Sequence, residues 1–134
     1  MKRYRAPESL CYFCTLTVVD WIPIFIDKRY IEPILSSLTF CREKKGLTLY
    51  GFVIMPNHLH LLAEAGEQLE SVMRDFKRCT SRSIQDILRA ENRTTLLRWL
   101  SNATEPTGRN KGSSSLWQSG FHPKAIMNSK KLRP

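Results

Sequence analysis

Three stretches of the chain show the hydrophobic pattern of β-structure. Leu10 to Val19 is rich in aromatic and β-branched residues and contains neither glycine nor proline, which predicts a strand buried on at least one face. Leu47 to Met55 predicts a second strand, and His58 to Ala63 predicts a third. Pro56-Asn57 between these two is a turn signal. We therefore expect the second and third strands to form a hairpin.

Two other segments repeat their hydrophobic residues every three or four positions, as amphipathic helices do. The first begins after Asp27, whose carboxylate can cap a helix, and ends at Gly46. Its apolar positions are Ile31, Ile34, Leu35, Leu38 and Cys41. The second predicted helix is longer and carries basic residues on its other faces. Its apolar positions are Leu69, Val72, Met73, Phe76, Ile84, Ile87 and Leu88.

The last third of the chain has weaker patterns. Between Glu91 and Ser115 it combines a short apolar patch, Leu96 to Leu100, with a stretch from Glu105 to Ser113 that we expect to be a mobile loop. Leu116 to Gln118 and Phe121 to Met127 supply the residues for one last short strand.

The order strand, helix, hairpin, helix, strand is that of the βαββαβ folds. It predicts an α+β, ferredoxin-like structure in which an antiparallel sheet carries both helices on one face. The other face of the sheet is then free to carry a functional site. A length of 134 residues is typical of one domain, and no internal repeat is present, so we expect residues 1–134 to form a single domain.

Composition limits the classes of protein that the chain can belong to. About 42% of the residues are hydrophobic, which suffices for a core, yet no apolar run approaches the ~20 residues needed to cross a membrane. The basic start, Met1 to Pro7, is not followed by an apolar signal core. These features predict a cytoplasmic protein that does not contact membranes.

The four cysteines do not predict a disulfide framework, because they are spread thinly in a chain that can fold without crosslinks. Cys11 and Cys14 have a spacing seen in zinc sites. However, residues i and i+3 of a strand point to opposite faces, which argues against structural zinc.

Charge points to a polyanionic partner. The chain has 21 Lys and Arg against 12 Asp and Glu, a formal net charge of +9. Each contact with a phosphate releases counterions and adds affinity without regard to sequence. Nucleic acid is therefore a candidate partner, although charge alone does not decide the matter.

His58 and His60 are the strongest candidate site. Alternate residues of a strand share a face, so both imidazoles project together, roughly 7 Å apart at their backbones, while Leu59 and Leu61 point to the opposite side. Neutral imidazole suits divalent transition ions, and two imidazoles at this spacing can bind one ion. Two ligands leave positions for water or substrate oxygens, as a catalytic site requires. Spacing alone does not exclude two idle surface histidines.

The residues around this pair resemble a known family. The string Gly51 to Leu62 (GFVIMPNHLHLL) closely resembles the motif of the single-strand DNA transposases with an HUH motif, especially the REP-associated tyrosine transposases. Phe76-Lys77 and Leu116 to His122 (LWQSGFH) are similar to other recurring segments of the family and occur in the same order. The resemblance extends from about Leu10 to Asn128.

The resemblance implies a ferredoxin-like domain and a chemistry. In the family the two histidines bind a divalent cation, usually Mg or Mn, that polarises a scissile phosphate in single-stranded DNA. A tyrosine then attacks, forms a 5′ phosphotyrosine bond and is released when a 3′ hydroxyl rejoins the DNA. The substrate is typically a hairpin beside a short guide sequence, and members are commonly homodimers. On this basis we expect DNA nicking and rejoining in transposition and recombination, with His58 and His60 as catalytic and metal-binding residues.

The nucleophile is the point at which the chain departs from the family pattern. The family tyrosine stands in a Tyr-x-x-Asn-Pro-like stretch shortly after the segment that matches Phe121-His122, and the sequence reaches Pro134 without one. Three explanations compete: a truncated gene, domestication as a non-cleaving DNA-binding protein, or another residue in this role. We favour truncation. Tyr50, on the strand paired with the histidine strand, is the candidate replacement, but ordinary sheet tyrosines are far more common.

The second predicted helix supplies the candidate phosphate contacts, which are Arg74, Lys77, Arg78 and Arg82. Without the resemblance, these residues would be taken for a solvated helix face. His122 is a candidate for a third metal ligand or for a DNA contact, and Gln118 and Glu64 are other candidates for completing the metal shell. Trp117 and Phe121 are equally compatible with stacking on unpaired bases and with the core.

Two functions of other classes remain as alternatives. One is a catalytically inactive module that holds single-stranded or hairpin DNA through the basic helix. The other is a two-histidine phosphoesterase, which needs a second His-x-Ser/Thr motif that His122-Pro123-Lys124 does not supply.

Overall fold

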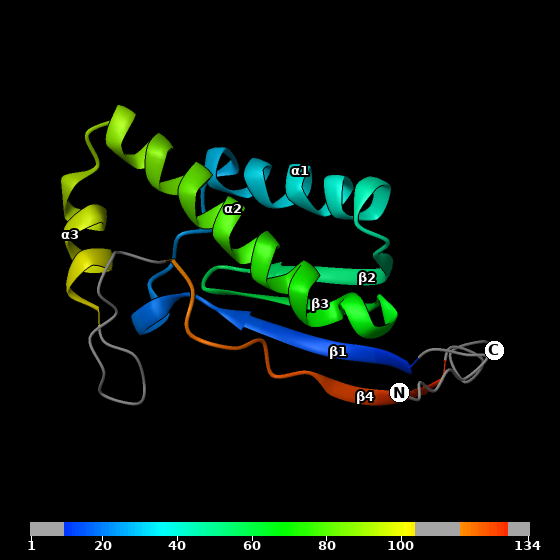
Figure 1. Cartoon of the computed structure of the whole chain (residues 1–134). Coiled ribbons are helices and arrows are strands. Elements are labelled where there is room, and N and C mark those ends of the chain that lie inside the picture. Colours follow the sequence, from blue (N-terminus) through cyan, green and yellow to red (C-terminus); the bar gives the residue numbers. More distant parts are fainter. Residues whose placement is uncertain (1–9, 104–115, 129–134) are drawn as a thin grey trace.

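The structure of the protein is a computed structural model that describes residues 10–103 and 116–128. Four strands and two long helices follow the predicted order, with a shorter third helix before the last strand (Figure 1). The elements are β1 (Leu10–Thr17), η1 (Val19–Trp21), α1 (Lys28–Lys44), β2 (Thr48–Met55), β3 (His58–Glu64), η2 (Gly66–Gln68), α2 (Leu69–Ala90), α3 (Thr94–Asn102) and β4 (Lys124–Asn128).

The strands form one sheet in the order β2-β3-β1-β4, and every neighbouring pair is antiparallel. This is the expected order of a βαββαβ chain, so the α+β, ferredoxin-like prediction is confirmed. The register between the central strands pairs Thr15 with His60 and Thr17 with His58. Both residues of β1 therefore share a face with the two histidines.

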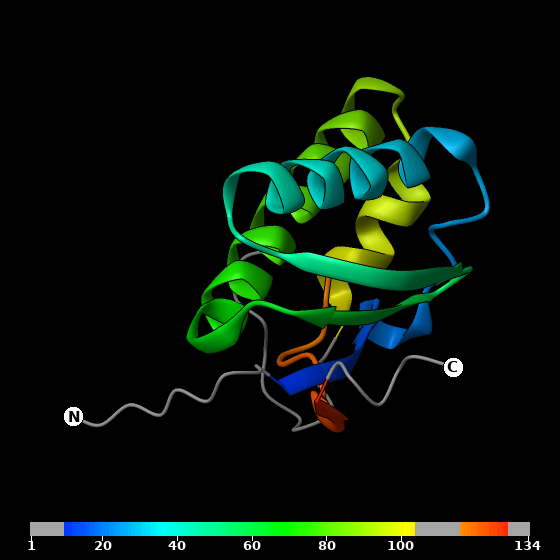
Figure 2. The ribbon, with the colours of Figure 1, turned by 90° about the vertical axis from the view of Figure 1, so that its right-hand side faces the viewer.

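Both long helices cover the same face of the sheet (Figures 1 and 2). The core lies between the two layers, where Leu59 and Leu61 of β3 meet the buried faces of α1 and α2. Helix α1 begins as predicted, because the Asp27 carboxylate accepts a hydrogen bond from the backbone N–H of Arg29. No helix of the described residues is long and apolar enough to span a membrane.

Helix α3 was not predicted. The apolar patch from Leu96 to Leu100 forms its inner face, with Leu100 fully buried and Leu96 and Leu97 packed against the core. Nine residues with no side-chain cap give too weak a helical signal in the sequence. In Figure 1, α3 lies at the end of the sheet where β1 ends and β3 begins. The predicted loop from Glu105 to Ser113 lies outside the described residues.

The last predicted strand is shorter than expected, because β4 begins only at Lys124. The preceding residues run beside β1 and are fixed by α2. Trp117 is 2% exposed and donates from its indole Nε1 to Thr80 Oγ1 at 2.9 Å. The Lys77 ammonium donates to the carbonyl oxygens of Gln118 and Gly120 at 2.8 and 2.7 Å. This anchoring positions the chain for its pairing with β1.

Candidate functional site

The two histidines lie together on the sheet face that the helices leave uncovered. His58 and His60 are both half-buried, whereas Leu59 between them is fully buried on the helical side. The centroids of the two imidazole rings are 4.7 Å apart, with the rings nearly perpendicular. The predicted convergence of the pair is thus present in the structure.

Each imidazole is held by a hydrogen bond to its Nδ1 atom. His58 Nδ1 lies 2.8 Å from Asn57 Oδ1, and because this oxygen can only accept, Nδ1 carries the proton. His60 Nδ1 lies 3.1 Å from Thr15 Oγ1. When Nδ1 of a neutral imidazole carries the proton, the free lone pair of the ring is on Nε2. Such outer contacts are the usual means by which proteins orient metal-binding histidines.

Aromatic side chains flank the pair. Phe13 stacks on the His60 ring with centroids 5.0 Å apart, and Trp21 approaches the His58 ring edge-on at 6.4 Å. Burial, followed by the nearby charge of His58, lowers the pKa of His60 below its ordinary value. The lowered pKa favours the neutral ring, which is the form that binds metal ions.

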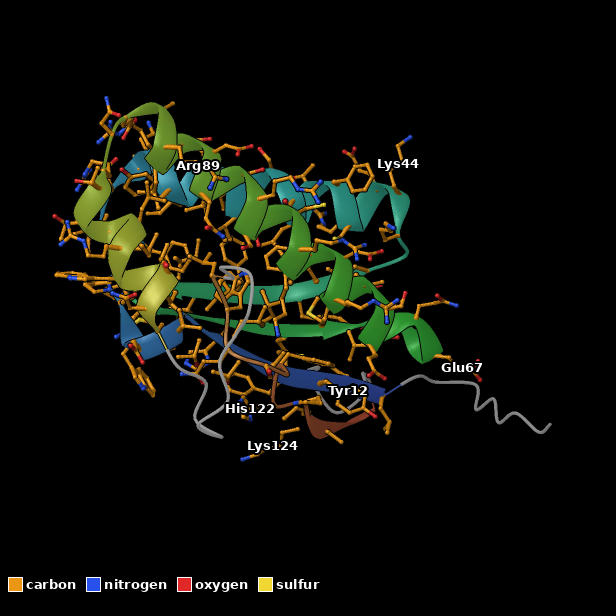
Figure 3. All side chains as sticks on the ribbon, turned by 60° about the vertical axis from the view of Figure 1, so that its left-hand side comes forward. Tyr12, Lys44, Glu67, Arg89, His122 and Lys124 are labelled. Carbon is orange, nitrogen blue, oxygen red and sulfur yellow. The ribbon has the colours of Figure 1, made fainter. Side chains whose placement is uncertain are left out.

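The donor set fits a divalent ion incompletely. Two Nε2 atoms could serve as nitrogen ligands, but the described residues contain no group of three His, Cys, Asp or Glu able to hold a metal. Glu64, a candidate third ligand, accepts a hydrogen bond from the Tyr50 hydroxyl at 2.8 Å. His122 is exposed in the segment before β4, on the side of the sheet away from α1 and α2 (Figure 3). Neither residue forms a metal-binding cluster with the pair.

The basic residues of α2 lie on the other side of the sheet from the histidines. Arg74, Arg78 and Arg82 recur every four residues and are all exposed, so they form one stripe on the outer surface of the helix. The structure therefore does not bring this stripe to the histidine pair. The Lys77 ammonium binds the two carbonyl oxygens described above. DNA contact by these four residues stays a prediction.

The structure also shows the surroundings of the aromatic residues considered for base stacking or catalysis. Trp117 is a core residue, so its alternative role in base stacking is excluded by burial. Phe121 packs partly buried against the core. The Tyr30 hydroxyl is inside the protein and donates to Glu91, and the Tyr50 hydroxyl donates to Glu64.

Three residues that contact the site were missed from the sequence. Asn57, taken only as a turn residue, bonds His58 and also donates from Nδ2 to the Trp21 carbonyl oxygen at 3.2 Å. Thr15 and Phe13 reach His60 from β1. Their alternation along β1 is visible in the sequence, but the strand register that brings them to His60 is not.

Comparisons with known proteins agree with the fold and the motif. Residues 17–101 match the family model described as IS200-like transposase. No protein with a curated function matches the sequence. Among solved structures, a protein from Deinococcus radiodurans R1 described as a transposase has a TM-score of 0.63 at 16% identity, over 98% of this chain and 91% of that chain.

A second solved structure is a REP-associated tyrosine transposase bound to a REP hairpin. Its TM-score is 0.56 at 18% identity, over 99% of this chain and 67% of that chain. At these identities the two structures establish the shared fold, while the family match covers more than half of the sequence, including both histidines. The chain therefore belongs to the IS200-like transposase family.

Proposed function

We propose that the protein binds single-stranded or hairpin DNA and, with a divalent metal ion, supports nicking and rejoining of the strand during transposition. The observation that carries this proposal is the pair His58 and His60, held through Nδ1 so that both Nε2 atoms remain available on the open face of the sheet. A solved structure of similar fold contains a REP hairpin, which supports DNA of this kind as the substrate.

The residues present fit a divalent ion such as Mg or Mn, with His58 and His60 as its protein ligands. Imidazole nitrogen favours Mn over Mg, and further ligands would be water or DNA oxygens. When bound, such an ion would neutralise the negative charge that develops on a phosphate under attack. The contribution of the chain itself is orientation, because Asn57 and Thr15 fix the two rings before any ligand arrives.

The strand transfer that we propose requires a tyrosine oxygen to bond to the phosphorus while the 3′ oxygen leaves, and then the reverse step. The structure offers no prepared nucleophile at Tyr30, whose hydroxyl is inside the protein and bonded to Glu91. Tyr50 is more exposed, on β2. We infer that the protein works as a homodimer, as is common in the family. The competing function is that of a catalytically inactive DNA-binding module.

One experiment separates these functions. The protein is incubated with labelled single-stranded hairpin DNA and Mn²⁺ or Mg²⁺, beside the double variant His58→Ala, His60→Ala. A control is Phe40→Ala, which removes an exposed aromatic side chain on α1, away from the histidine pair. A covalent protein–DNA adduct formed by the wild type and the control but not by the double variant would establish a working nuclease in which another tyrosine, to be sought first at Tyr50, is the nucleophile.

Each other outcome has a definite meaning. Hairpin binding without an adduct identifies an inactive DNA-binding module. Mn²⁺ binding, followed in parallel by electron paramagnetic resonance, tests the metal site without activity. Equal Mn²⁺ affinity of the wild type and the double variant would refute the assignment of the two histidines as ligands.

A further inference from the structure

Two exposed tryptophans from segments that are far apart in sequence border one pocket, and one of them, Trp21, contacts His58. Trp21 is 59% exposed at the end of η1, and Trp99 is 49% exposed on α3. A pocket of about 350 Å³ is bordered by both, together with Pro23. Single exposed apolar side chains are normal on a protein surface, but exposed apolar side chains that together line a groove often mark a binding site. We call Trp21, Pro23 and Trp99 the aromatic track.

The aromatic track begins at the candidate metal site. The Trp21 ring contacts His58 edge-on, with centroids 6.4 Å apart. Asn57 links the same two residues by its side chain, since Oδ1 accepts from His58 and Nδ2 donates to the Trp21 carbonyl oxygen. The position of Trp21 is therefore fixed relative to the imidazoles.

The backbone at this point is strained in a way that keeps Trp21 exposed. Asp20 and Trp21 have φ values of 53° and 55°, in the left-handed region that bulky residues rarely adopt. Hydrogen bonds from the Trp21 N–H to Val18 and from Asn57 to Trp21 maintain this conformation. Strain of this kind is common where a side chain is presented for binding.

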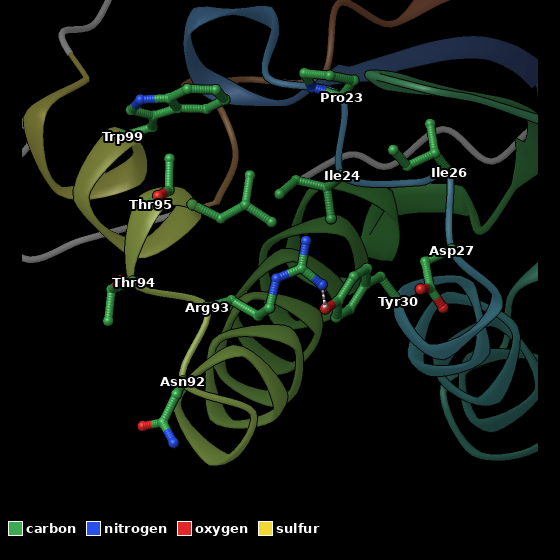
Figure 4. A pocket seen from close by; sticks show the side chains of 11 residues that line it. Pro23, Ile24, Ile26, Asp27, Tyr30, Asn92, Arg93, Thr94, Thr95 and Trp99 are labelled. Carbon is green, nitrogen blue, oxygen red and sulfur yellow. Dashed lines mark hydrogen bonds between the residues drawn. The ribbon is translucent and has the colours of Figure 1, made fainter.

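The other end of the aromatic track opens into a larger pocket of about 510 Å³, which shares Pro23 and Trp99 with the first (Figure 4). In Figure 4, Arg93 lies across this pocket from Asp27, and its guanidinium donates to the Tyr30 hydroxyl at 3.0 Å. A planar guanidinium fixed in this way and an indole ring are both groups on which nucleobases stack.

The charges around the larger pocket largely cancel. The Asp27 carboxylate accepts hydrogen bonds from the Arg29 guanidinium at 3.1 and 2.7 Å, and Glu91 accepts from Arg29 as well. Base stacking, rather than attraction for phosphates, is therefore the main interaction that this surface offers to DNA.

We propose that the aromatic track binds the unpaired nucleotides that adjoin the phosphate held at His58 and His60, with a base stacked on Trp99. This inference rests on the proposed DNA-binding function and adds a location for the single-stranded segment. It assigns no role in recognition of the hairpin stem.

The test compares two labelled DNA hairpins by fluorescence anisotropy, one blunt and one with an unpaired tail of about eight thymidines, a length within the range of one single-strand site. Tails at the 5′ and at the 3′ end are tested separately. We expect the wild-type protein to bind one tailed hairpin more tightly than the blunt one. Trp99→Ala should lower affinity for that tailed hairpin about 5- to 150-fold, which corresponds to the usual effect of one stacked base.

Three controls make this result specific. Trp99→Phe keeps an aromatic ring and should retain most of the tail preference. Phe40→Ala removes an aromatic side chain that is 52% exposed on α1, away from the aromatic track, and should bind as the wild type does. The dependence of affinity on salt should be the same for Trp99→Ala and wild type, since no cation is lost.

Three outcomes would overturn the inference. If the wild type binds tailed and blunt hairpins equally, or if Trp99→Ala keeps the tail preference, the aromatic track does not bind unpaired nucleotides, while the proposed function stands. If the wild type binds no hairpin at all, the proposed function fails together with the inference.

Discussion

The contact between Trp117 and Thr80 gives a stability prediction whose size follows from the structure. Thr80 is fully buried, and its hydroxyl donates to the Phe76 carbonyl oxygen at 2.8 Å while accepting from Trp117 Nε1 at 2.9 Å. Thr80→Val keeps the shape of the side chain but removes the acceptor. The indole N–H would then lose this acceptor in the interior, which costs about 1 to 3 kcal/mol.

This free energy translates into a measurable change in melting temperature. An unfolding entropy of about 2.1 cal/mol/K for each of the 134 residues gives about 0.28 kcal/mol/K for the chain. Thr80→Val should therefore lower the melting temperature by about 4 to 11 °C. Circular dichroism measures this shift, and urea unfolding gives the free energy itself.

A double-mutant cycle isolates the hydrogen bond from other effects of the substitution. In Trp117→Phe the indole N–H is absent, so Thr80→Val should cost at least about 1 kcal/mol less in that background than in the wild type. Additive effects of the two substitutions on the free energy of unfolding would refute the reasoning, because they would show that the two side chains are not coupled.

Three further predictions concern the site and its supports. Thr15→Val removes the partner of His60 Nδ1 and should weaken Mn²⁺ binding about 10- to 100-fold in electron paramagnetic resonance titrations, whereas unchanged affinity would exclude a role for this contact. Lys77→Met removes two charge-assisted hydrogen bonds to carbonyl oxygens and should lower the free energy of unfolding by about 1 to 3 kcal/mol in urea; wild-type stability would contradict this. Hydrogen bonds from Arg29 lower the pKa of Asp27 from 3.8 to about 2, so its stabilising effect is complete above pH 3.8 and is lost as pH falls toward 2. In Asp27→Asn the free energy of unfolding should fall less between pH 3.8 and pH 2 than in the wild type. An unchanged dependence of this free energy on pH would contradict the prediction.

The fold was accessible from the sequence because each main element has a clear local signal. Aromatic and β-branched runs, with a turn signal at Pro56-Asn57, predicted β1 to β3, and three- and four-residue spacing predicted α1 and α2. Together these elements limit the chain to few topologies. Helix α3 escaped because its inner face consists of only three leucines, Leu96, Leu97 and Leu100. Tertiary packing against the core, rather than the strength of the local pattern, decides such a short helix.

The site was only partly accessible from the sequence, for a different reason. Alternation along one strand places His58 and His60 on one face, but Thr15 is 45 residues away from His60 and meets it only through the register of β1 and β3. Lys77 shows the same difficulty on a helix. Lys77 was predicted only as a phosphate contact, but it also holds two carbonyl oxygens, because the neighbouring segment returns to that side of α2.

The uncovered sheet face explains how one small domain can combine a rigid site with access for a large ligand. The helices bury one side of β3, so the backbone that carries His58 and His60 is fixed by the core without any cover over the imidazoles. On the open side, Phe13, Val53 and Met55 remain partly exposed around the pair, although burial of such residues is favourable. A DNA strand laid across this face would cover apolar surface as well as supply phosphate oxygens. Metal binding and DNA binding should therefore be mutually reinforcing in this protein, each with higher affinity when the other ligand is present.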